Sequence, residues 1–70
     1  MTTYEVAFAD YDGQRSFDHE RQSLTDDSDA AVEAALADLE QRLGRKLPLD
    51  TRTDFPSFTL YGDGEEIGGG

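Results

Sequence analysis

The 70-residue sequence predicts an α+β fold of ββαβ type, in which one helix packs on one face of a three-stranded sheet. Three observations lead to this class. Apolar and polar residues alternate over 3–10 and again over 57–61, which is the pattern of half-buried strands. An Asp-Gly pair follows the first of these segments and predicts a hairpin. Between the two segments, residues 28–43 carry apolar side chains at helical spacing.

The first element is a strand over residues 3–10, with Tyr4, Val6 and Phe8 on one face. The pair Asp12-Gly13 then predicts a two-residue type I′ turn, because both central positions of that turn take positive φ angles. Such a turn pairs Phe8 with Phe17, Val6 with His19 and Asp10 with Arg15. The second strand is therefore expected to carry an aromatic residue toward the core and an arginine toward Asp10.

The helix is predicted to begin after Asp27 or Ser28, since either side chain can cap the first free amides. It is predicted to end at Gly44, which suits the left-handed conformation that often follows a helix. Its core-facing stripe is spaced i, i+4, i+7 and i+11. The stripe consists of Val32, Leu36, Leu39 and Leu43.

After the helix, Leu47-Pro48-Leu49 is expected as a short edge segment, and residues 57–61 as a third strand with Phe58 and Leu60 inward. Residues 62–64 predict a turn, after which a short fourth strand can follow over 65–67. Because the helix can carry the chain over its hairpin, the third strand is expected beside the first, in the order 2-1-3. We expect one domain over 1–67 and a flexible glycine tail over 68–70.

Charge dominates the composition, with 16 acidic against 6 basic residues and a net charge of −10. The Asp-rich, Lys-poor profile resembles that of cytoplasmic proteins from salt-loving archaea, which implies adaptation to high salt and a cytoplasmic location. Nucleic acid is not an expected partner, because phosphate binding needs a clustered basic face. A membrane is not expected either, since no apolar run approaches spanning length and no signal segment opens the chain.

No catalytic residue, metal site or cofactor is predicted. The single histidine, His19, has no second polar partner on its predicted face, and the chain has no cysteine. We therefore expect a non-enzymatic regulator or adaptor that binds another protein, and a homodimer formed by helix faces or strand edges. The expected interaction surface is the part that one helix leaves uncovered, namely Tyr11, Leu24 and Tyr61.

An alternative comes from a resemblance. A hairpin, a helix, a further strand and a terminal Gly69-Gly70 resemble a minimal ubiquitin-like β-grasp protein, the class that includes modifiers and sulfur carriers. The resemblance implies activation at the terminal glycine and conjugation through Gly69 and Gly70. It also implies a reversing strand over 46–50 and parallel pairing of 57–61 with the first strand. A simple ββαβ unit makes that pairing antiparallel.

Overall fold

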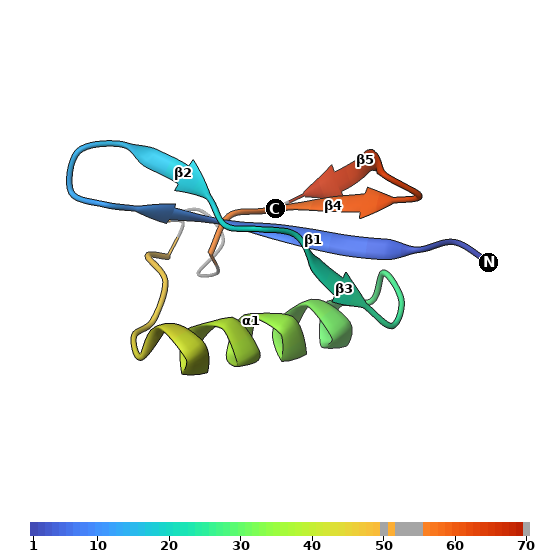
Figure 1. Ribbon diagram of the computed structural model, residues 1–70, viewed down its shortest axis with the longest axis horizontal. Coiled ribbons are helices and arrows are strands. Elements are labelled where there is room, and N and C mark those ends of the chain that lie inside the picture. The colour runs from blue at the N-terminus through green and yellow to red at the C-terminus, as the bar shows by residue number, and fades with distance from the viewer. Residues whose placement is uncertain (50, 52–55, 70) are drawn as a thin grey trace.

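The computed structural model describes residues 1–49, 51 and 56–69 (Figure 1). The predicted α+β class is confirmed, because one helix packs against an antiparallel sheet. Within the described residues the elements are β1 (Tyr4–Tyr11), β2 (Ser16–Asp18), β3 (Gln22–Leu24), α1 (Asp29–Leu43), β4 (Phe58–Gly62) and β5 (Glu65–Gly69). Figure 1 shows α1 running along one side of the sheet, with β3 beside its first turns.

β1 is the central strand of the sheet. The strand order is β2-β1-β4-β5, and β3 also pairs with β1, next to β2 along the same edge. β4 corresponds to the predicted third strand, so its expected place beside the first strand is confirmed. The β1–β4 pairing is antiparallel, from Tyr4 opposite Gly62 to Phe8 opposite Phe58. This is the polarity of a simple ββαβ unit and differs from the parallel pairing that a β-grasp arrangement requires.

The predicted register of the first hairpin is wrong by two residues. Tyr11 faces Ser16 and Asp10 faces Phe17, so four residues form the loop and Arg15 is not opposite Asp10. The cause is the side chain of Asp12, whose Oδ1 accepts hydrogen bonds from the backbone amides of Gln14 and Arg15 at 2.8 and 2.9 Å. These bonds stabilise a wider loop than the two-residue turn.

The expected second strand is divided into β2 and β3 by a bulge. Ala9 pairs with Asp18, but Val6 pairs with Gln22. The segment opposite β1 therefore has one residue more than β1 between these two pairs. His19, at the start of the bulge, donates its backbone amide to the Phe8 carbonyl at 2.9 Å. The extra residue reverses the alternation, so that Gln22 and the residues that follow it change faces relative to an unbroken strand.

α1 has the caps that the sequence predicted. The Ser28 hydroxyl accepts a hydrogen bond from the Ala31 amide at 3.2 Å, and Gly44 takes a φ of 75° and donates to the Glu40 carbonyl at 2.9 Å. The helix packs on the sheet face that carries Val6 and Phe8, called the inner face below. The buried core consists of Val6, Phe8, Val32, Leu39 and Leu47, with Phe58 and Leu60 packed against it as predicted.

The second hairpin joins β4 to β5. Asp63 and Gly64 both have positive φ, at 52° and 86°, and Gly62 faces Glu65, which is the geometry of a type I′ turn. β5 continues to Gly69, beyond the fourth strand that the sequence predicted. Gly68 and Gly69 face Leu60 and Thr59, so these two residues of the expected flexible tail are paired in the sheet. Gly70 lies outside the described residues.

Close backbone approach explains the glycine at position 69. A Cβ added to Gly69 would lie 2.6 Å from the Phe58 carbonyl oxygen, whereas one added to Gly68 would meet nothing within 4 Å. The segment from Lys46 to Leu49, by contrast, forms no strand. The expected edge segment at Leu47-Pro48-Leu49 is instead an irregular connection that buries only Leu47, because that side chain completes the core under α1.

Candidate functional site

Among the described residues, the carboxylate of Asp10 accepts more side-chain and backbone hydrogen bonds than any other side chain, and it is 0% exposed. Its Oδ1 accepts hydrogen bonds from the Tyr11 amide at 2.7 Å and from Arg45 Nη1 at 3.2 Å. Its Oδ2 accepts from His19 Nε2 at 2.7 Å and forms a short ion pair with Arg45 Nη2. Asp10, His19 and Arg45 are called the Asp10 cluster below.

Three separate elements bring this cluster together. Asp10 lies near the end of β1 and alternates with Val6 and Phe8, so its side chain is on the inner face. The bulge places His19 beside Phe8, and the rings of Phe17 and His19 form an edge-to-face contact with their centroids 5.1 Å apart. The left-handed Gly44 ends α1, and Arg45 follows at once and reaches back to β1.

Electrostatics keep Asp10 ionised. The hydrogen bond from Arg45 holds the pKa of the Asp10 carboxyl well below its usual range, and the bonds from His19 and the Tyr11 amide act in the same direction, while burial opposes them. The same bond from Arg45 to the carboxylate raises the pKa of that guanidinium. Because an ionised carboxylate only accepts hydrogen bonds, the proton between Asp10 and His19 belongs to Nε2 of the histidine.

The contacts of the Asp10 cluster connect parts of the fold to one another. Four donors occupy the two oxygens of Asp10, so this carboxylate has little capacity left to accept a proton from a substrate or to bind a metal ion. Within the residues that the structure describes, no three His, Cys, Asp or Glu side chains are grouped in a way that could hold a metal ion. The carboxylate joins β1 to the bulge and to the end of α1.

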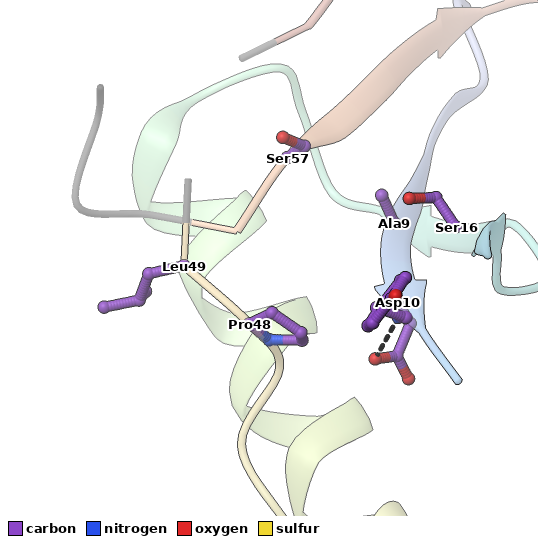
Figure 2. Close-up of a pocket in the computed structure, with 7 residues that line it drawn as sticks. Ala9, Asp10, Ser16, Pro48, Leu49 and Ser57 are labelled. Carbon is purple, nitrogen blue, oxygen red and sulfur yellow. Dashed lines mark hydrogen bonds between the residues drawn. The ribbon is translucent and has the colours of Figure 1, made fainter. Parts of the chain in front are cut away.

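An open cavity of about 160 Å³ lies beside the cluster (Figure 2). Ala9, Asp10 and Ser16 lie on one side of it and Pro48 and Ser57 on the other, while the side chain of Leu49 is directed away from Asp10. Tyr11 and Leu49 both line this cavity and are 51% and 61% exposed. The full lining is Ala9, Asp10, Tyr11, Ser16, Pro48, Leu49 and Ser57, and the space is called the Tyr11 cavity below.

The structure does not bring the predicted surface residues Tyr11, Leu24 and Tyr61 into one patch. Tyr61 faces Glu5, six residues from Tyr11 along β1 and so roughly 20 Å away at the usual rise of a strand. Its ring is half-buried and lies under the guanidinium of Arg21, whose central carbon is 3.6 Å from the ring centroid. Leu24 faces Tyr4 and packs against the core, because the bulge turned it inward.

Neither the Asp10 cluster nor the presence of Leu49 in the lining of the Tyr11 cavity was predicted from the sequence. One signal for the cluster is visible in the sequence, since Asp10 continues the inward series of Tyr4, Val6 and Phe8 and a buried carboxylate must be paired. The predicted hairpin register gave Asp10 an arginine partner, Arg15, but the structure has Arg45 in that role, and His19 has the polar partner that the predicted register did not give it.

No protein family, curated protein or solved structure matched the chain. Among the described residues, no helix is long and apolar enough to cross a membrane.

Proposed function

We propose that this chain is a non-catalytic protein-binding domain, adapted to high salt, which binds its partner at the Tyr11 cavity. The observation that carries the proposal is that two large residues, Tyr11 and Leu49, are more than half exposed and both belong to the lining of one open cavity. Exposed apolar residues grouped around a hollow are typical of protein-binding surfaces, and tyrosine is among the residues that most often supply binding energy there.

The charge of the chain indicates the chemistry of the partner. With a net charge of −10, the domain favours a partner whose surface is basic, and an apolar side chain of that partner would occupy the cavity. Asp12, directly after Tyr11, is exposed and held ionised because the amides of Arg15 and Gln14 lower the pKa of its carboxyl. It offers a charge for a lysine or arginine at the rim.

Absence of an available base supports a non-catalytic role. Among the described residues, Asp10 is the one carboxylate that lines the Tyr11 cavity, and its oxygens already accept four hydrogen bonds. Tyr11 and Ser16 also line the cavity, but within the part of the chain described neither hydroxyl is hydrogen-bonded to a histidine or a carboxylate that could activate it. Binding is the function that this lining supports.

The proposal is tested by capture from an extract of the source cells in multimolar potassium chloride, followed by calorimetry with the purified partner. We expect Tyr11→Ala and Leu49→Ala to weaken binding at least about tenfold, as truncation of an anchoring residue does. Ile67→Ala is the matched control, because Ile67 is 51% exposed, like Tyr11, but lies on β5 away from the cavity. Equal binding by all four proteins, or loss only in Ile67→Ala, would refute the proposal.

A further inference from the structure

A second cavity, of about 290 Å³, lies between the bulge and the C-terminal half of α1. His19, Glu20, Arg21 and Gln22 line it from the sheet side, and Leu39 and Arg42 line it from the helix. The two helical residues are three positions apart, so they share one face of α1 and point toward the same neighbours. Its volume lies just below the usual range of about 300–1,000 Å³ for small-molecule sites.

The side chain of Gln22 is incompletely paired within this cavity. Its Oε1 accepts a hydrogen bond from Arg42 Nη2 at 3.0 Å, while its Nε2 is buried and has no partner in the described part of the chain. The assignment of the two amide atoms is fixed by chemistry, because exchanging them would direct an amide N–H at a guanidinium N–H. A buried N–H donor without an acceptor is costly, so this position favours an incoming oxygen atom.

Other groups around Gln22 also favour a negatively charged oxygen. Two arginines line the cavity, but the guanidinium of Arg21 lies over the Tyr61 ring, so Arg42 supplies the positive charge beside Gln22, and the one lining carboxylate among the described residues is that of Glu20. Arg42 already uses Nη2 for Gln22 and for Asp38, at 3.0 Å each, which leaves its other N–H groups for a ligand. Leu39, which is largely buried, supplies an apolar wall.

We propose that this second cavity binds a small free carboxylate, whose oxygens accept hydrogen bonds from Gln22 Nε2 and from the guanidinium of Arg42. A short aliphatic chain on the ligand packs against Leu39. The Asp10 cluster supports this site indirectly, because Asp10 holds Nε2 of His19 and so fixes the imidazole that lines the cavity. The second cavity shares no lining residue with the Tyr11 cavity, so the carboxylate site and the protein-binding site can be tested independently.

The test is a titration of the full chain followed by ¹H–¹⁵N NMR, at constant pH and with ionic strength held by potassium chloride. Potassium acetate and potassium butyrate are the probes, and inorganic phosphate is the competing oxyanion. We expect saturable shifts of the backbone amides of residues 19–22 and 39–42, with butyrate binding more tightly than acetate. In Gln22→Leu the affinity should fall roughly tenfold, the loss expected for one hydrogen bond to a charged group.

Gln41→Leu is the matched control, because it makes the same substitution at an exposed position of α1 outside the cavity lining. It should bind like the unmodified chain, and unchanged spectra elsewhere show that both variants fold. Three results would overturn the proposal. The first is chemical shifts that rise linearly without saturation, which would mean that only water occupies the second cavity. The others are equal affinities of Gln22→Leu and Gln41→Leu, and saturable binding of phosphate without binding of the carboxylates.

Discussion

Replacing Asp10 by asparagine tests how the sheet is held to the end of α1. The substitution keeps the size of the side chain but removes the charge and turns one acceptor oxygen into an amide N–H₂ group. In the chain as it stands, Oδ2 accepts from His19 Nε2 at 2.7 Å and pairs with Arg45 Nη2. In Asp10→Asn, an amide donor faces those donors in a position that is 0% exposed.

The expected cost is about 2–3 kcal/mol. Removing one partner of a fully buried ion pair costs about 3–5 kcal/mol. Here Arg45 is 49% exposed, so its guanidinium can turn to water, and the figure must be lowered for that hydration. Small domains are stable by only about 0.05–0.15 kcal/mol per residue, so the loss is a large fraction of the total.

The assay is urea unfolding followed by circular dichroism, with Asp18→Asn as control. Asp18 is exposed on β2, so its replacement removes the same charge without removing a buried contact. Because the folded-state pKa of Asp10 is depressed, its contribution is complete above the unfolded-state pKa of about 3.9 and is lost as pH falls from there toward the folded value. The difference between the chain and Asp10→Asn should therefore shrink as the pH falls below about 4.

Salt separates this effect from general repulsion. A buried pair is screened much less than exposed charges, so the cost of Asp10→Asn should persist in concentrated potassium chloride. If Asp10→Asn lies within about 0.5 kcal/mol of Asp18→Asn at pH 7, the cluster does not stabilise the fold and the reasoning is refuted.

Three further predictions concern the whole domain. The thermal midpoint should rise between about 0.1 and 2 M potassium chloride, because screening relieves a net charge of −10, and an unchanged midpoint would contradict this. Gly69→Ala should lower the free energy of unfolding in urea by about 1–3 kcal/mol, because the added Cβ would lie 2.6 Å from the Phe58 carbonyl oxygen. Gly68→Ala is the control and should lower it less, because a Cβ there meets nothing within 4 Å. Equal losses would indicate an unpaired tail. Sedimentation in multimolar salt should show a homodimer formed by helix faces or strand edges, and a monomer at high protein concentration would exclude it.

Local signals predicted most of the fold. The alternation of Tyr4, Val6 and Phe8 predicted β1, and the cap at Ser28 with the stop at Gly44 predicted α1. These elements are encoded by neighbouring residues, so one sequence is sufficient to find them. The place of β4 beside β1 followed from the length and position of the helix, which is a property of connectivity.

The first hairpin could not be predicted in the same way, although the chain contains two Asp-Gly pairs. Asp63-Gly64 forms a type I′ turn, with the Asp63 side chain accepting the Thr3 amide at 2.8 Å. Asp12-Gly13 does not, because the Asp12 side chain bonds amides of its own loop. The same dipeptide thus gives two loops, and what differs is a partner that is remote in sequence.

The error in register was also invisible to the hydrophobic pattern. A shift of two residues leaves the same side chains on the inner face, so the core residues are equally satisfied by the predicted and the observed pairing. What changes is the neighbour of each polar group, and this is why the contact between Asp10 and His19 was missed. The bulge then turned Leu24 inward and divided the predicted interaction surface.

The central position of β1 determines the order in which the sheet can be completed. β1 is made early, and β2, β3 and α1 follow it, but its other edge pairs only with β4, from Tyr4 opposite Gly62 to Phe8 opposite Phe58. Until the ribosome has released residues 58–62, that edge has no intramolecular partner and is open to other chains. Closing so long a loop is slow compared with forming a helix, so this edge of the nascent chain is prone to aggregate until residues 58–62 have paired with it.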